Sequence, residues 1–190
     1  MEEIITSLKH WEAVRNNPDV LTELFMSNLG FELDMSLFPE KKPLHAYAAV
    51  KDGELGFYVI SEVNDVDSSP EDLSANCYWC PALMAFEGGG QEIPEAEANL
   101  RLGTWKETFP IWIQQIVKMP FGIYQTFHIP TTDLKPQKYA ALFALKDNII
   151  TPDIKEADLV LTNNAGIFYD TIRSQPPYSY TSQYYILSLI

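Results

Sequence analysis

The spacing of apolar residues near the N-terminus predicts two consecutive amphipathic helices. Over residues 3–15 the apolar side chains recur at helical intervals, at Ile4, Ile5, Leu8 and Trp11. Asn17 is a good N-cap for the second helix, and Pro18 suits its first position. The apolar stripe of that helix consists of Val20, Leu21, Leu24 and Phe25. Gly30 is placed to end it.

A β-hairpin and a buried strand are predicted next. Residues 44–50 and 54–61 are rich in β-forming residues and flank Asp52-Gly53, a dipeptide typical of tight hairpin turns. The acidic segment 62–75 is predicted to be a loop. Within it, Ser69-Pro70-Glu71-Asp72 has the pattern of the first turn of a short helix. Residues 76–86 are almost wholly apolar, which favours a buried strand.

The second half of the chain is predicted to be mostly strand after one helical stretch. Gly88-Gly89-Gly90 indicates a loop and leaves open a boundary between two halves, 1–87 and 91–190. In the helical stretch that follows, helices are expected to start at Pro94 and at Pro110, and Pro120 is expected to end the second. Strands are expected at about 121–129, 138–145, 158–162, 167–172 and 182–190.

This order of elements predicts an α+β fold. Because strands and helices do not alternate, we expect a mostly antiparallel sheet with the two N-terminal helices and one or two central helices packed on it. The chain has 190 residues, of which 46% are hydrophobic, enough for a sizeable core. We therefore expect a single α+β domain over residues 1–190.

Charge narrows the choice of partner. The formal net charge is −13, from 13 Lys and Arg against 26 Asp and Glu. A nucleic acid would be repelled. The acidity fits a role in solubility, and the alternative is that it attracts a basic protein partner. The acids predicted to contact such a protein cluster in the segment after the hairpin: Glu62, Asp65, Asp67, Glu71 and Asp72.

The predicted location is the cytoplasm. The N-terminal residues have neither the basic region nor the apolar run of a signal peptide, and no apolar stretch is long enough to span a membrane. Cys77 and Cys80 are the two cysteines, a number that fits a reducing compartment. Since they are expected in a strand, three residues apart and facing opposite sides, they are predicted to be buried free thiols.

The sequence carries no catalytic or metal-binding signature. His10, His45 and His128 are isolated, and no pair of them has the spacing of metal ligands. The glycine run at 88–90 lacks the Lys-Ser/Thr of a phosphate loop. We therefore expect no catalytic residue, no bound metal and no cofactor.

Aromatic residues gather in the middle of the chain. Most are expected in the core, since aromatic side chains dominate cores. The alternative is a ligand pocket near residues 105–128, and its candidate lining residues are Trp105, Trp112, Tyr124 and His128.

The same region resembles the suppressor-of-fused-like domains of bacteria. The resemblance rests on Phe109-Pro110-Ile111-Trp112-Ile113, on Met119-Pro120-Phe121, and on Phe127-His128-Ile129-Pro130 followed by late strands at 139–145 and 184–190. Phe127 stands where that family has glycine. The resemblance covers residues 44–190 and implies a noncatalytic protein-binding domain, in bacteria one proposed to act as an immunity protein that neutralises a toxin.

Three functional hypotheses follow. The first is a noncatalytic, acidic, cytoplasmic immunity or inhibitor protein that binds a basic protein. The second is an enzyme or small-molecule binder that uses the aromatic pocket. The third is a subunit of a larger assembly, in which the uncharged, Tyr-rich segment 174–190 pairs as an edge strand. The sequence leaves the oligomeric state open.

Overall fold

The structure is a computed structural model that describes residues 1–83, 93–148, 153–163, 168–169, 173–175 and 184–190. Four α-helices lie in these ranges: α1 (Glu2–Val14), α2 (Pro18–Met26), α3 (Pro70–Ala75) and α4 (Glu95–Ile116). Two 3₁₀ helices, η1 (Met35–Leu37) and η3 (Tyr185–Leu189), complete the helical elements described. None of these helices combines the length and apolar character that a membrane span requires.

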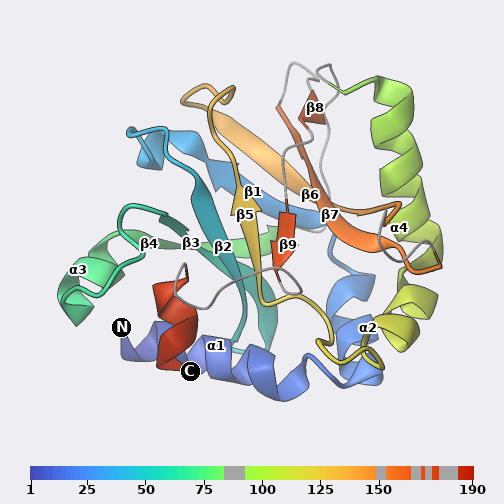
Figure 1. Cartoon of the computed structure of the whole chain (residues 1–190), viewed down its shortest axis with the longest axis horizontal. Helices are drawn as coiled ribbons and strands as arrows, with labels where there is room; N and C mark the ends of the chain where they lie inside the picture. The colour runs from blue at the N-terminus through green and yellow to red at the C-terminus, as the bar shows by residue number, and fades with distance from the viewer. Residues whose placement is uncertain (84–92, 149–152, 164–167, 170–172, 176–183) are drawn as a thin grey trace.

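Nine strands of the described residues form one antiparallel sheet (Figure 1). They are β1 (Gly30–Asp34), β2 (Leu44–Lys51), β3 (Glu54–Ser61), β4 (Cys77–Leu83), β5 (Thr126–Ile129), β6 (Lys138–Lys146), β7 (Glu156–Thr162), β8 (Phe168–Tyr169) and β9 (Arg173–Gln175). Their order is β8-β7-β6-β1-β4-β3-β2-β5-β9. The predicted α+β fold with a mostly antiparallel sheet is confirmed.

Strand β4 joins the two halves of the sheet. Its first part, Cys77–Pro81, pairs with β3, and its last two residues, Ala82 and Leu83, pair with β1. The sheet curls, so that β9 at one edge also contacts β7 near the other. Strands from the second half of the chain lie on both sides of the strands from the first half.

Both faces of the central strands are covered, which explains why β2 and β3 are buried almost throughout. On one face α2 and α4 pack over the main core, where Phe25, Trp105 and Phe143 make edge-to-face and tilted contacts. On the other face, the first half of α1 and η3 cover a smaller core that includes Leu8, Tyr47 and Ile186. The two termini lie close together on this face (Figure 1).

The local patterns account for the first elements of the fold. The side chain of Asn17 accepts hydrogen bonds from the backbone N–H groups of Asp19 and Val20, as its N-cap role predicts. The hairpin of β2 and β3 turns through Asp52 (φ 52°) and Gly53 (φ 85°). Ser69 caps α3 by accepting from the N–H of Asp72. The strand predicted at 76–86 is present as β4, but only Cys77 and Cys80 in it are buried, and residues 84–86 lie outside the described residues.

Gly30 does not end the second helix, contrary to the prediction. The helix ends at Met26, and Gly30 is the first residue of β1. A Cβ at this position would lie 2.0 Å from the carbonyl oxygen of Ala141 in β6. Glycine is therefore needed for the close approach of two strands, which a single sequence does not reveal.

Two further predictions of helix and strand boundaries were wrong. Pro110 does not start a helix; it lies inside α4, which runs unbroken from Glu95 to Ile116. Trp105 and Trp112 bury their rings on either side of it, and this packing offsets the lost backbone hydrogen bond. The strand expected at 121–129 is confined to Thr126–Ile129.

The C-terminal strand expected at 182–190 is also wrong where the structure describes it, because Tyr185–Leu189 form the 3₁₀ helix η3. Tyr184 and Ile186 are buried while Ser188 and Ile190 are exposed. Alternating burial over so short a segment fits a strand as well as a tight helix. Gly88–Gly90, the predicted loop and possible boundary, lie outside the described residues.

Candidate functional site

The loop that follows β3 carries an acidic surface. Residues 62–69 leave the sheet and lead into α3, and their exposed side chains combine carboxylates with two valines. Val63 is 46% exposed and Val66 is 49% exposed. We call the group the acidic loop surface; it consists of Glu62, Val63, Val66, Asp67, Glu71 and Asp72.

Among the side chains that the structure describes, no Lys or Arg forms an ion pair with this surface. Residues 52–100 contain no lysine or arginine. In the described part of the chain, the Lys and Arg ion pairs go to other carboxylates, those of Glu3, Glu12, Glu32, Glu97, Asp147 and Asp158. The acidic loop surface is therefore a local concentration of acidic side chains that no described Lys or Arg side chain pairs with.

Asp65 holds this loop against the sheet through hydrogen bonds of its buried side chain. Its side chain is buried and accepts three hydrogen bonds, from Nδ1 of His45 at 2.6 Å, from the hydroxyl of Tyr47, and from the backbone N–H of Ile186 at 3.1 Å. A buried carboxylate needs such partners, because an unpaired one would be costly. We call His45, Tyr47 and Asp65 the buried polar cluster.

The strand register explains how this cluster forms. His45 and Tyr47 are two residues apart in β2, so both side chains project from the same face of the sheet. Backbone bonds then turn the chain after β3, since the N–H groups of Asn64 and Asp65 both donate to the carbonyl of Ser61, at 2.9 and 3.1 Å. The turn brings Asp65 back over His45 and Tyr47.

Two tyrosines around the cluster remain neutral over the physiological range. Burial, reinforced by the charge of Asp65, raises the pKa of Tyr47 well above its ordinary value. Burial also raises the pKa of Tyr184 to about 12. The ring of Tyr184 lies 4.3 Å from that of His45, between centroids, so the C-terminal segment closes the cluster from one side.

His128 joins the edge of the cluster from a neighbouring strand. In the antiparallel pairing of β2 with β5, His45 lies directly opposite His128, and their ring centroids are 5.9 Å apart. Nε2 of His128 also lies 3.7 Å from a carboxylate oxygen of Glu62. One nitrogen of each histidine and one oxygen of Glu62 all fall within 4.8 Å of one another, a grouping that can hold a metal ion.

The structure corrects two predictions about site residues. Asp65 is not an exposed acid available to a partner, because it is 4% exposed and holds the loop in place. His45 and His128 are not isolated, because strand pairing brings them together across 83 positions of sequence. Antiparallel register is set by the whole sheet and cannot be read from either histidine alone.

The remaining predicted residues divide between surface and core. Glu62, Asp67, Glu71 and Asp72 are exposed on one loop and the helix that follows it, as the partner-binding prediction requires. Trp105, Trp112 and Tyr124 are each 3% exposed and belong to the main core, so their rings serve packing rather than a ligand pocket. His128 faces the buried polar cluster instead.

The two cysteines are buried free thiols, as predicted. They lie in β4 on opposite faces of the sheet, Cys80 in the main core and Cys77 in the smaller one. Burial raises the pKa of both thiols to about 12, so neither is a ready nucleophile or metal ligand.

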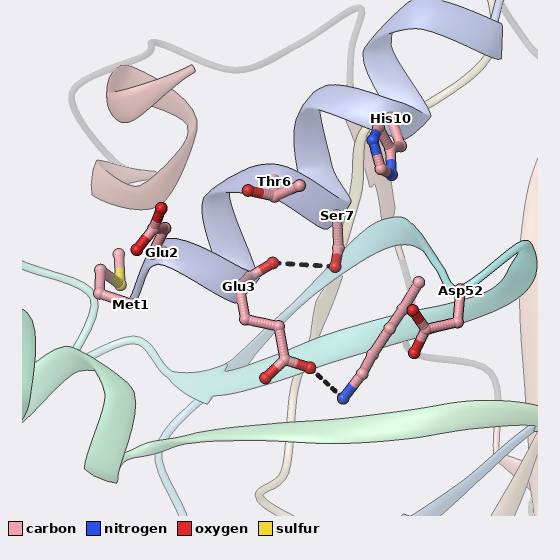
Figure 2. Close-up of a pocket in the computed structure, with 8 residues that line it drawn as sticks. Met1, Glu2, Glu3, Thr6, Ser7, His10 and Asp52 are labelled. Carbon is pink, nitrogen blue, oxygen red and sulfur yellow. Dashed lines mark hydrogen bonds and ion pairs between the residues drawn. The ribbon is translucent and has the colours of Figure 1, made fainter.

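A shallow pocket beside α1 offers less chemistry. Figure 2 shows it between the first turns of α1 and the β2–β3 turn, lined by side chains that include Glu2, Glu3, His10 and Asp52. Its cation, Lys51, is already paired with Glu3, and the hydroxyl of Ser7 donates to the carbonyl of Glu3 at 2.9 Å. These pairings already engage Lys51 and Ser7 within the protein.

No family model, no curated protein and no solved structure matches this chain. The resemblance to suppressor-of-fused-like domains therefore stays a prediction.

Proposed function

We propose that this chain is a noncatalytic protein-binding module whose acidic loop surface binds a basic protein. The observation that carries the proposal is the combination of exposed carboxylates with two exposed valines on a loop that is tied to the sheet by Asp65. An immunity or inhibitor protein that covers a basic toxin is the most specific version of this function.

Pre-organisation supports the proposal. A loop that must be ordered on binding loses affinity through its conformational entropy, whereas a loop held in advance does not. Asp65 accepts bonds from two sheet residues and from the C-terminal segment, and Ser69 caps α3 at the other end of the loop. The acids and valines are thus presented on a fixed frame.

Charge supports it in a second way. Acids grouped on one surface attract a basic partner during diffusion and disfavour acidic proteins and nucleic acids. The valines give the same surface an apolar area that a partner can cover. Polar groups around an apolar centre are the usual arrangement of a protein–protein interface.

The test is affinity capture from a lysate of the source organism with three forms of the chain. The loop variant carries Asp67→Asn, Glu71→Gln and Asp72→Asn. The control variant carries Asp19→Asn, Glu23→Gln and Glu107→Gln, which make the same change in net charge on exposed acids of α2 and α4. The loop variant neutralises two first-turn acids, Glu71 and Asp72 of α3, and the control variant neutralises one, Asp19 of α2.

We expect the wild-type chain and the control variant to capture the same basic protein, released by high salt, and the loop variant to lose it. Salt should weaken the complex because exposed charges are screened. Equal capture by the loop variant, or equal loss by both variants, would show that the acidic loop surface is not the binding site.

A further inference from the structure

We propose that His45, His128 and Glu62 bind one divalent transition-metal ion, with Zn²⁺ the ion that the ligand chemistry favours. The site goes beyond the proposed protein-binding function and does not depend on it. It rests on the donor atoms of three residues that lie within 4.8 Å of one another.

The donor set has the right composition for zinc. Two imidazole nitrogens and one carboxylate oxygen are borderline ligands that suit Zn²⁺ better than Mg²⁺ or Ca²⁺, which prefer oxygen alone. The 3.7 Å separation between Nε2 of His128 and Oε2 of Glu62 is close to the edge of a zinc tetrahedron, about 3.4 Å when ligands lie about 2.1 Å from the ion.

Asp65 orients His45 for this role. A carboxylate accepts hydrogen bonds, so Asp65, 2.6 Å from Nδ1 of His45, favours the tautomer that carries its hydrogen on Nδ1. The other ring nitrogen, Nε2, then carries the lone pair that a metal needs. Zinc-bound histidines are commonly fixed in this way by a carboxylate behind the ring.

The exposed fraction of the side chain rises from His45 to His128 to Glu62, as expected for a metal site that opens to solvent on one side. The side chain of His45 is 2% exposed, that of His128 is 27% exposed, and that of Glu62 is 50% exposed. The ion would therefore sit at the margin of the sheet, reached from solvent past Glu62. Three protein ligands leave a fourth position for water or for a donor atom of another molecule.

The simplest alternative is a purely structural polar cluster. In that case Asp65, His45 and Tyr47 serve only to hold the loop and the C-terminal segment. That role requires neither Glu62 nor His128, both of which project from the margin of the cluster. The experiment therefore targets these two residues and leaves the buried polar cluster intact.

The test is a calorimetric titration of Zn²⁺ into protein freed of metal with a chelator, comparing the wild type with single variants. His128→Ala and Glu62→Gln each remove one ligand. His10→Ala, which removes an exposed histidine of α1, and Glu71→Gln, which makes the same change as Glu62→Gln elsewhere on the acidic loop surface, are the matched controls. Thermal unfolding without metal checks that each variant folds.

We expect the wild type and both controls to bind one Zn²⁺ per chain, and each ligand variant to bind at least about tenfold more weakly, since even loss of a supporting residue costs a metal site about 10–100-fold. Visible absorption bands of tetrahedral Co²⁺ in the wild type, lost in His128→Ala, provide a second readout. Absence of saturable binding, or equal weakening by Glu71→Gln, would overturn the proposal. Because His128 is not part of the acidic loop surface, its variant separates metal binding from partner binding.

Discussion

At the scale of single residues, Asp65 is the side chain on which the candidate site depends. It connects β2, the loop after β3 and the C-terminal segment through its three hydrogen bonds. Asp67, two residues later, is exposed and accepts one bond from the hydroxyl of Tyr185 at 2.7 Å. The two aspartates are close in sequence and opposite in burial, so they form a natural comparison.

We predict that Asp65→Ala lowers the free energy of unfolding by about 3 kcal/mol or more, because it leaves buried donors without an acceptor. Asp67→Ala should cause a much smaller change, since water replaces the lost bond. Urea unfolding of both variants measures the difference. Similar losses of stability in the two variants would contradict the central role of Asp65.

The buried thiols predict a specific dependence on alkaline pH. Burial raises the pKa of Cys77 and Cys80 to about 12, whereas a thiol of the unfolded chain ionises near pH 8.5. The folded state therefore keeps its protons after the unfolded state has released them. The stabilisation is complete below about pH 8.5 and is lost as the pH rises towards 12.

The measurement is the free energy of unfolding between pH 8 and 11 for the wild type and for the double variant Cys77→Ala, Cys80→Ala. The wild type should lose stability more steeply than the double variant over this range. Parallel pH profiles for the two proteins would show that the thiols already ionise in the folded state.

At the scale of elements, the C-terminal segment acts as part of the second core. Ile186 is fully buried against α1 and β2, and its N–H bonds to Asp65, whereas Ile190 is 36% exposed. This arrangement disagrees with the third hypothesis as it concerns residues 185–189, since a 3₁₀ helix does not offer an edge for strand pairing.

We predict that Ile186→Ala costs about 2–5 kcal/mol of stability, the usual range for a large-to-small change in a core. Ile190→Ala should change the free energy of unfolding by no more than about 0.5 kcal/mol. Thermal or urea unfolding provides the comparison. If the two substitutions cost the same, the segment is not docked as the structure describes.

Elements with local signals could be predicted from the sequence, and elements defined by distant contacts could not. Asn17-Pro18, Asp52-Gly53 and Ser69-Pro70 each encode a cap or a turn within a few residues, and all three lie where expected. Strand β1 has no local sequence signal of this kind. Its first residue, Gly30, must be glycine because the backbone of the paired strand β6 lies too close for a side chain. The register that places His45 opposite His128 is likewise a property of the assembled sheet.

The acidic residues of the candidate site could be found from the sequence, but which of them is buried and which are exposed could not. Charge identified the segment that begins at Glu62, since nothing basic interrupts it. The backbone turn after Ser61 then decides that Asp65 points inwards while Asp67 points outwards. A sequence pattern of alternating acids does not contain that turn.

At the scale of the whole molecule, the curled sheet brings the buried polar cluster and the acidic loop surface together. Both faces of β2 and β3 are covered, so the loop after β3 lies at the margin of the sheet, between α3 and η3 (Figure 1). The buried polar cluster lies beneath this loop, and the acidic loop surface lies above it. The proposed binding surface therefore requires that the loop is held in place in the free protein.

Amide hydrogen exchange, followed by NMR on the free protein, tests this claim most directly. Four amides report on it: those of Asn64 and Asp65, which donate to Ser61, that of Glu62, which donates to Pro43, and that of Ile186, which donates to Asp65. We predict that all four are protected in the wild type and that Asp65→Ala removes the protection of Ile186 and weakens that of the loop. Exchange of these amides at the rates of an unfolded chain in the wild-type protein would contradict it.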